Sequence, residues 1–225
     1  MNTDVIVLAA GKGTRMYSDL PKVLHPLGGK PMLSHVLDAA LAIDADTIHL
    51  VTGYQSDQVR SYFDQHPVAT PLNWVEQTEQ LGTGHAVMQA APMVDDSKTV
   101  LVLYGDVPLI SPASLRQLRE KAQTTGIAVL TLITEDPTGL GRIIRDDHDR
   151  IVAIVEEKDA TPEQKQITEI NTGIMAFNAG RLKTWLSSLN TANAQGEYYL
   201  TDTVAIACRS GCTVGSLQTF DENEV

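Results

Sequence analysis

The feature that most constrains the fold is an alternation of short apolar segments with segments of helical periodicity between residues 5 and 134. Short apolar runs rich in β-branched residues indicate strands that are buried on both faces. This order predicts βαβ units and a mostly parallel sheet with helices on both faces. The predicted strands are residues 5–9, 47–51, 72–75, 99–103 and 127–134, and the predicted helices are residues 31–41, a segment from 56, 85–91 and a segment from 112.

Serine residues mark two of these helix starts. Ser56 is expected to be the N-cap of its helix, and Ser111 is expected to cap the helix that Pro112 opens. Both expectations follow from the preference of serine for the N-cap and of proline for the first helical position.

The pattern changes after residue 134. It predicts strands at residues 141–145, 150–156, 169–177 and 213–217, and helices over residues 179–189 and 197–209. We therefore expect one α/β domain over residues 1–225, with a Rossmann-like, doubly wound, mostly parallel sheet. A nucleotide-binding lobe would cover residues 1–134, and a smaller mixed lobe of about residues 135–225 would lay antiparallel strands beside that sheet.

Composition disfavours several classes of protein. The 17 Lys+Arg and 28 Asp+Glu residues give a net charge of −11, which disfavours non-specific binding of nucleic-acid backbones. No uncharged apolar run reaches the roughly 18 residues of a membrane helix, and the first residues lack the basic head of a signal peptide. Cys208 and Cys212 suggest neither a disulfide scaffold nor a metal framework. We expect a cytoplasmic protein with no nucleic-acid or membrane partner.

The loop after the first predicted strand reads AAGKGTRM over residues 9–16. Open α/β sheets bind ligands at the carboxyl ends of their strands, and glycines let backbone N–H groups approach an anion. Met16 replaces the third small residue of a dinucleotide fingerprint, and the Gly-Lys-Ser/Thr of a Walker loop is absent. A phosphate-binding loop is favoured, and a tight turn with solvated Lys and Arg is the alternative.

Positive charge is concentrated in the same region. Between residues 10 and 30 only Asp19 opposes the basic side chains, which are Lys12, Arg15, Lys22 and Lys30. A basic segment in an acidic protein favours a polyanionic ligand such as a triphosphate. The alternative is a solvated charged loop that binds no ligand.

An aspartate follows the predicted strand at residues 99–103. The carboxylate of Asp106 would reach the same crevice as the first loop, where a hard oxygen ligand suits a Mg²⁺–nucleotide complex. The alternative is a turn residue before Pro108. Further polar segments at residues 77–85, 156–157, 171–173 and 196–199 would bind a base or a hydroxylated ligand, or would cap and turn the chain.

Several segments together resemble the sugar-1-phosphate nucleotidyltransferases (pyrophosphorylases). They match most closely the N-terminal uridyltransferase domain of the bacterial bifunctional N-acetylglucosamine-1-phosphate uridyltransferases/glucosamine-1-phosphate acetyltransferases. The matches run in order from residue 5 to about residue 205. They are residues 8–16 (LAAGKGTRM), 20–22 (LPK), 79–86 (EQLGTGHA), 104–109 (YGDVPL), 136–142 (DPTGLGR), 169–173 (EINTG) and 195–202 (QGEYYLTD).

The resemblance implies the reaction UTP + N-acetylglucosamine 1-phosphate ⇌ UDP-N-acetylglucosamine + pyrophosphate with Mg²⁺, for peptidoglycan and lipopolysaccharide precursors. It implies that Arg15 and Lys22 are catalytic and meet the phosphates, and that Asp106 is catalytic and binds the metal. The residues implied to hold uridine are Leu8, Ala9, Ala10, Gly11, Gln77, Gly82 and Thr83. Those implied to line the sugar side, mostly from the lobe over residues 135–225, are Tyr104, Gly105, Gly141, Glu156 and Asn171.

Two differences from that family bear on activity. Its members continue beyond the position of Val225 into a Gly-Val-Asn segment that supplies a second metal ligand, and then into a β-helix acetyltransferase domain through which they form trimers. Neither is present in this sequence, so we expect Asp106 to hold Mg²⁺ with phosphates and water only, weakened turnover and a monomer. Another sugar-1-phosphate nucleotidyltransferase and a non-catalytic nucleotide-sugar binding module stay open. An NAD-dependent oxidoreductase is disfavoured by Met16.

Overall fold

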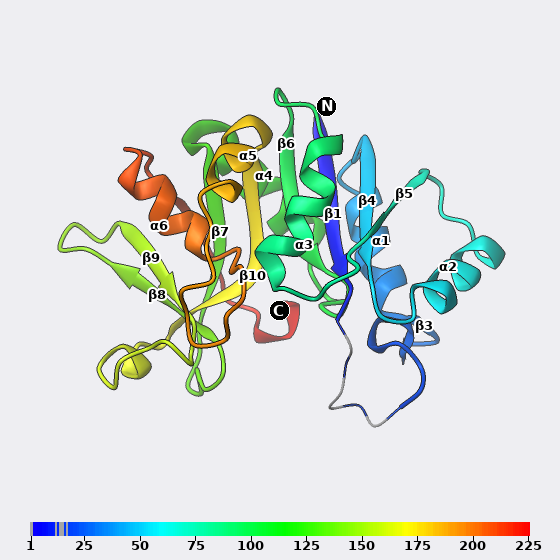
Figure 1. Ribbon diagram of the computed structural model, residues 1–225, viewed down its shortest axis with the longest axis horizontal. Coiled ribbons are helices and arrows are strands. Elements are labelled where there is room, and N and C mark those ends of the chain that lie inside the picture. The colour runs from blue at the N-terminus through cyan, green and yellow to red at the C-terminus, as the bar shows by residue number, and fades with distance from the viewer. Residues whose placement is uncertain (1, 12, 14–15, 17) are drawn as a thin grey trace.

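The computed structural model describes residues 2–11, 13, 16 and 18–225, and it confirms the predicted α/β class with a mostly parallel central sheet (Figure 1). The strand order is β11-β7-β10-β6-β1-β4-β5. All neighbours are parallel except β10, which is antiparallel to both β6 and β7. The bounds are β1 (Thr3–Ala9), β4 (Thr47–Thr52), β5 (Leu72–Glu76), β6 (Thr99–Tyr104), β7 (Ile127–Ile133), β10 (Glu169–Asn178) and β11 (Gly215–Thr219).

A hairpin of β8 (Gly141–Arg145) and β9 (Ile151–Val155) extends from β10, and β2 (Pro26–Leu27) pairs with β3 (Lys30–Pro31) in a separate two-stranded sheet. These antiparallel strands lie beside the central sheet, as expected for β8 and β9. Short 3₁₀ helices occur at η2 (Lys22–Leu24), η3 (Ala91–Met93), η4 (Gln164–Gln166) and η5 (Glu222–Glu224).

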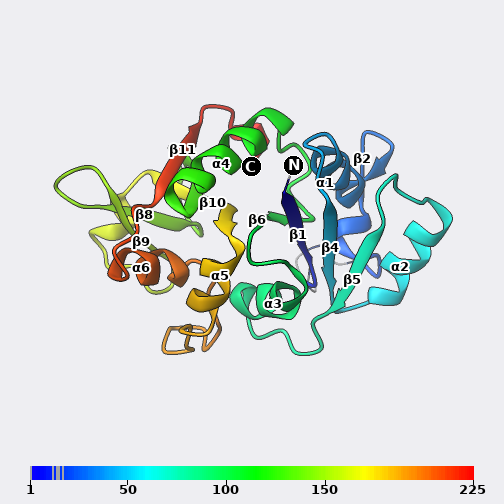
Figure 2. The ribbon, with the colours of Figure 1, turned by 90° about the horizontal axis from the view of Figure 1, so that it is seen from above.

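Helices cover both faces of the sheet (Figure 2). On one face lie α1 (Met32–Leu41) and α4 (Pro112–Thr125), with α2 (Ser56–Gln65) packed into the same core toward β5. On the other face lie α3 (Thr83–Ala90), α5 (Ala179–Leu186) and α6 (Asp202–Arg209). The alternation of side chains along β1 divides them between the two cores: Val5 and Val7 face α1, and Ile6 and Leu8 face α3.

The position of β10 differs from our expectation. We expected it beside the parallel sheet, but it lies within the sheet between β6 and β7. The connection from β6 through α4 to β7 skips one strand position, which β10 fills after the hairpin. The central sheet therefore draws strands from both halves of the chain.

Two expectations about helix starts were wrong. The chain enters α2 through Gln55 in a left-handed conformation with φ 56°, so Ser56 is the first helical residue and caps nothing. The helix expected over residues 197–209 begins at Asp202, because the backbone of Tyr198 is bonded to Leu81 and Gly84 instead. Ser111 does cap α4, where its hydroxyl accepts a hydrogen bond from the N–H of Ser114 at 3.1 Å.

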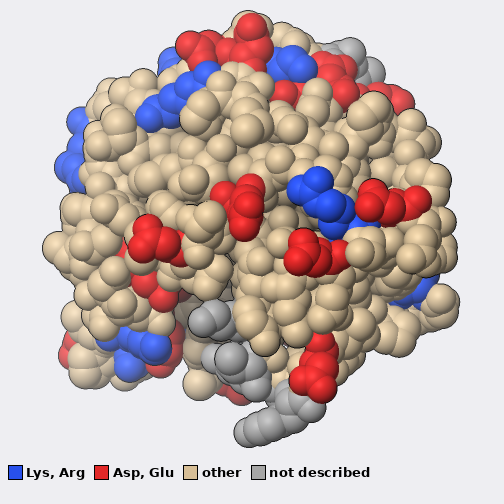
Figure 3. Space-filling model, turned by 45° about the vertical axis from the view of Figure 1, so that its right-hand side comes forward, with Lys and Arg blue, Asp and Glu red and all other residues tan. Residues whose placement is uncertain are grey.

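The surface in Figure 3 carries Lys and Arg side chains singly or in small groups, with acidic and uncharged side chains around them. Among the residues that the structure describes, no helix combines the length and apolar character needed to span a membrane.

Candidate active site

The carboxyl ends of the parallel strands β1, β6, β4 and β5 meet at one edge of the sheet. The N–H of Gly105 after β6 donates to the carbonyl of Leu8 in β1 at 2.9 Å. The N–H of Gln77 after β5 donates to the carbonyl of Thr52 in β4 at 2.8 Å. These bonds bring the segments that follow the four strands together, as expected for an open α/β sheet.

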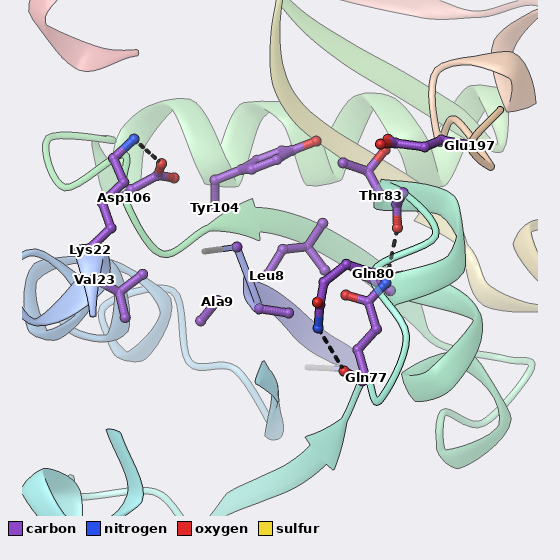
Figure 4. A pocket seen from close by; sticks show the side chains of 14 residues that line it. Leu8, Ala9, Lys22, Val23, Gln77, Gln80, Thr83, Tyr104, Asp106 and Glu197 are labelled. Atoms are coloured by element: carbon purple, nitrogen blue, oxygen red, sulfur yellow. Dashed lines mark hydrogen bonds and ion pairs between the residues drawn. The ribbon is translucent and has the colours of Figure 1, made fainter. Parts of the chain in front are cut away.

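A cavity of about 240 Å³ opens at this edge (Figure 4). Ten of its lining residues are among those predicted from the sequence: Leu8, Ala9, Ala10, Gly11, Lys22, Gln77, Gly82, Thr83, Tyr104 and Asp106. Gly105 lies behind the lining, where a Cβ would approach Cγ1 of Val23 to 3.1 Å. Arg15 and Lys12 lie outside the described residues.

Four lining residues were not named as site residues from the sequence, and these are Val23, Gln80, Ala86 and Glu197. Val23 and Ala86 are apolar and carry no chemical signal of a site. Gln80 lies inside the segment 77–85 that was singled out for base recognition. Glu197 lies inside the polar segment 196–199, which was also singled out, and this segment reaches the cavity because the N–H of Tyr198 donates to the carbonyl of Leu81 at 2.8 Å.

An ion pair stands at one end of the cavity. Nζ of Lys22 donates to Oδ2 of Asp106 at 2.6 Å (Figure 4). Lys22 begins the 3₁₀ helix η2 directly after Pro21, whose ring restricts φ, while Asp106 follows β6. Both side chains are partly exposed, at 40% and 28%, so a ligand in the cavity can reach them.

The same carboxylate is the candidate for a metal ligand. No group of three or more His, Cys, Asp or Glu side chains that could hold a metal ion occurs among the described residues. Mg²⁺ takes one or two carboxylates together with phosphates and water. Asp106 therefore fits Mg²⁺ only as part of a metal–nucleotide complex, in which phosphate oxygens supply most of the ligands.

Amide and imidazole groups lie at the other end of the cavity. Gln77 is only 3% exposed. Its Nε2 donates to the carbonyl of Gly82 at 3.1 Å and lies 3.1 Å from Nδ1 of His85. Gln80 in turn donates from Nε2 to the carbonyl of Gln77 at 3.3 Å. This end therefore offers hydrogen-bonding groups to a planar, polar ligand.

The residues predicted to line the sugar side form a second cluster on the hairpin and on β10. Gly141 pairs with Asn171 across β8 and β10, and a Cβ on Gly141 would lie 3.5 Å from Oε2 of Glu156. Oε1 of Glu156 accepts a hydrogen bond from the hydroxyl of Thr201 at 2.8 Å. Burial raises the pKa of the Glu156 carboxyl, and the bond from Thr201 lowers it in part.

Tyr104 links this cluster to the cavity. Burial is the main cause that raises the pKa of its phenol, and the nearby Glu156 raises it further. Gly173, with φ +88°, leaves room for the tyrosine ring, because a Cβ there would lie 2.7 Å from Cε2 of Tyr104. Tyr104 therefore stays neutral and lies near both Asp106 in the cavity and Glu156.

Comparison with known families identifies the chain. The model of the MobA-like NTP transferase domain matches residues 5–167, which include every strand end that lines the cavity. The chain belongs to this family. It is therefore a nucleotidyltransferase by family.

Solved structures show the same fold. A UDP-glucose pyrophosphorylase, determined with UDP-glucose, is 19% identical and superposes with a TM-score of 0.82 over 97% of this chain and 91% of its own. A chain assigned as a glucose-1-phosphate thymidylyltransferase from Bacillus anthracis, determined with sucrose, is 20% identical, with a TM-score of 0.76 over 96% of this chain and 87% of its own.

Proposed function

We propose that this nucleotidyltransferase transfers the uridylyl group of UTP to N-acetylglucosamine 1-phosphate and releases pyrophosphate. The observation that carries the proposal is the cavity itself, which places the Lys22–Asp106 pair at one end and the Gln77 amide at the other. Such a cavity suits a nucleoside triphosphate, because the phosphates need cations near them and the base needs hydrogen-bonding groups.

The orientation of the Gln77 amide supports a uracil base. The carbonyl oxygen of Gly82 can only accept, so the group 3.1 Å from it is the amide nitrogen of Gln77. The amide oxygen then lies on the cavity side (Figure 4). An acceptor there suits the N3–H donor of uracil and opposes N3 of cytosine, which is itself an acceptor.

The cluster around Glu156 supports a sugar next to the phosphates. Its carboxylate is bonded to Thr201 through one oxygen and faces the side-chain-free Gly141 with the other. Asn171 adds a buried amide, whose Oδ1 accepts from the N–H of Gly173 at 3.1 Å. Carboxylate and amide groups that are fixed in this way suit the hydroxyl and acetamido groups of N-acetylglucosamine.

The reaction needs no general base from the protein. The nucleophile is a phosphate oxygen of the sugar phosphate, whose second pKa is about 6, so it is ionised near neutral pH. This oxygen forms a bond to the α-phosphorus of UTP, and the bond from that phosphorus to the pyrophosphate oxygen breaks. The protein must align two anions and stabilise the charge that develops on the departing pyrophosphate.

Lys22 and Asp106 would stabilise that charge in different ways, Lys22 directly and Asp106 through a bound cation. In the free protein the ammonium of Lys22 is held by Asp106 at 2.6 Å. Bound phosphates draw the ammonium toward themselves and leave the carboxylate for a cation. Mg²⁺ bound there with the nucleotide would neutralise phosphate charge during the transfer. Arg15, predicted to meet the phosphates, is proposed as a second cationic side chain of the site.

A pyrophosphate-release assay over a panel of nucleotides and sugar 1-phosphates tests the proposal. We expect release with UTP and N-acetylglucosamine 1-phosphate, and much less with CTP, GTP or ATP. Asp106→Asn and Arg15→Ala should each lower kcat about 100-fold or more, the usual effect of losing one electrostatic stabiliser. Near-normal rates in both variants would overturn the proposed roles.

Lys22→Met has a matched control in Lys30→Met. Lys30 belongs to the same basic segment and pairs with Asp38, but it lies outside the cavity lining. We expect Lys22→Met to lower kcat strongly and Lys30→Met to leave it unchanged. Equal losses in the two variants would mean that general positive charge matters rather than the cavity.

A further inference from the structure

A buried arginine lies next to the residues proposed to hold the sugar. Arg142 is only 1% exposed, although it stands in β8 directly after Gly141. It is paired with Val155 of β9 on one side and with Ile170 of β10 on the other. Burial of a guanidinium is costly unless its donors are used, so the contacts of Arg142 must account for its presence here.

The guanidinium joins three segments of the chain. Nη1 donates to the carbonyl of Leu140, and Nη2 donates to Oε2 of Glu157 at 2.7 Å and, more weakly, to the carbonyl of Lys165 at 3.4 Å. The buried Nε of Arg142 has no hydrogen-bond partner among the described residues. A buried charge with an unused donor is often no more stable than an apolar side chain of similar volume. Stability alone therefore does not explain an arginine at this position.

Two of these acceptors adjoin residues that are proposed to bind the sugar. Leu140 precedes Gly141, and Glu157 follows Glu156. Gly141 faces Glu156, since a Cβ there would lie 3.5 Å from Oε2 of that carboxylate. Successive side chains of a strand point to opposite faces, so Arg142 extends away from this surface and meets Glu157 behind it.

The Arg142–Glu157 pair matters most for the position of Glu156. Val155 is the last residue of β9 and pairs with Arg142, so the ladder between the two strands ends before Glu156. The segment then turns, and the N–H of Asp159 donates to the carbonyl of Glu156 at 2.9 Å. Arg142 ties this turn to β8 through its bond to Glu157.

We propose that Arg142 is a positioning residue for the sugar phosphate. It fixes the backbone next to Gly141 and Glu156 from behind the site, while its own side chain is buried and does not line the cavity. The inference rests on the proposed function, because it takes these two residues as the ones that bind the sugar.

The test compares Arg142→Met with Arg142→Lys. Methionine has no donor, whereas lysine keeps the charge and can bond to Glu157 but lacks the planar fork of the guanidinium. Arg145→Met is the matched control. Arg145 lies in the same strand and makes two hydrogen bonds of 2.8 Å to Glu169, but Glu169 lies within β10 and is paired with β7. Each variant is compared by kcat, by the KM for UTP and for N-acetylglucosamine 1-phosphate, by Tm, and by calorimetric binding of UDP-N-acetylglucosamine.

We expect Arg142→Met to raise the KM for N-acetylglucosamine 1-phosphate and to weaken UDP-N-acetylglucosamine binding, each about tenfold, because small displacements of binding groups have effects of this size. The KM for UTP should change less than about twofold, since the base end of the cavity is a separate set of contacts. Arg142→Lys should restore part of the sugar affinity. Arg145→Met should leave the sugar affinity unchanged even where it lowers Tm as much.

Two results would overturn the inference. One is an unchanged KM for the sugar phosphate in a folded Arg142→Met variant. The other is an equal rise in the KM for UTP and for the sugar phosphate, which would indicate a general loosening of the protein.

Glu157→Gln approaches the same pair from its other side. The Glu157 side chain is 26% exposed, so its replacement buries no unpaired group. Glu157→Gln should raise the KM for the sugar phosphate about threefold, and should add little in the Arg142→Met background, where the bond is already lost. Fully additive effects would contradict the role of the pair. If the unmodified protein neither binds UDP-N-acetylglucosamine nor uses N-acetylglucosamine 1-phosphate, the proposed function fails and the inference with it, whereas normal sugar affinity in Arg142→Met overturns the inference alone.

Discussion

Gly82 is the position where one added methyl group should most disturb the base end of the cavity. Its backbone has φ 106° and ψ 176°, a conformation that is essentially restricted to glycine. A Cβ at this position would lie 2.6 Å from the carbonyl oxygen of Tyr198 and 2.9 Å from Cβ of Glu197. Gly82→Ala therefore combines backbone strain with a contact that is too short to persist.

The loss of stability in Gly82→Ala is estimated from the backbone strain and from the short contact. Forcing a residue with a side chain into this conformation costs about 1–3 kcal/mol. The loop that carries Tyr198 must also withdraw, although it is held by two backbone hydrogen bonds of 2.8 Å, to Leu81 and from Gly84. Each such bond contributes about 1 kcal/mol. Gly82→Ala should therefore cost about 3–5 kcal/mol, which lowers Tm by about 6–20 °C in a chain of this length.

Gly196 in the same loop provides the matched control. It also has a positive φ, of +66°, but a Cβ there would have no atom within 4 Å. Gly196→Ala thus tests backbone strain alone, about 1–2 kcal/mol. Scanning calorimetry should give a fall in Tm at least twice as large for Gly82→Ala.

The kinetic readout separates the two variants further. Only Gly82→Ala should raise the KM for UTP, by about tenfold, because the carbonyl of Gly82 is the group that holds Gln77. Equal falls in Tm for the two variants, or an unchanged KM in a folded Gly82→Ala variant, would refute the reasoning.

Two further predictions concern stability. Phe177 is fully buried in β10, whereas Phe220 is 87% exposed. In urea unfolding, Phe177→Ala should lower the free energy of unfolding by about 3–5 kcal/mol, and Phe220→Ala should lower it by less than about 0.5 kcal/mol. Similar losses in the two variants would contradict the assigned core. Burial raises the pKa of Asp4, but hydrogen bonds from His49 and Lys98 outweigh it and hold the pKa below its usual range. The stabilisation is therefore present above the unfolded-state pKa of about 3.9 and is lost as the pH falls through the lower folded-state pKa. In Asp4→Asn the free energy of unfolding should therefore fall less steeply as the pH is lowered into the acid range. An unchanged dependence on pH would contradict the assigned role of Asp4.

Much of the fold could be predicted because each parallel strand is buried on both faces and therefore reads as a continuous apolar run. β1 and β6 are such runs, and the residues after them mark the edge of the sheet that carries the cavity. The place of β10 could not be predicted in this way. Strand order depends on which edges are left unpaired after α4 crosses the sheet, and local sequence does not encode that.

The site was predictable to the extent that its residues directly follow strands. Lys22, Gln77 and Asp106 satisfy this condition or belong to a recognisable motif, and all three line the cavity. Glu197 belongs to the motif over residues 195–202, but its place at the cavity could not be predicted, because long-range backbone bonds bring its loop to the start of α3. The orientation of the Gln77 amide was likewise beyond sequence reasoning, since it depends on the place of the Gly82 carbonyl.

The central claim, that this cavity catalyses reversible uridylyl transfer, is tested most directly by pyrophosphate exchange. The protein is incubated with Mg²⁺, unlabelled UDP-N-acetylglucosamine and ³²P-labelled pyrophosphate, and the nucleotides are separated. The account predicts that label appears in UTP, at a rate that Asp106→Asn lowers about 100-fold. Absence of labelled UTP from protein that binds UDP-N-acetylglucosamine in calorimetry would contradict it and would indicate a binding module without turnover.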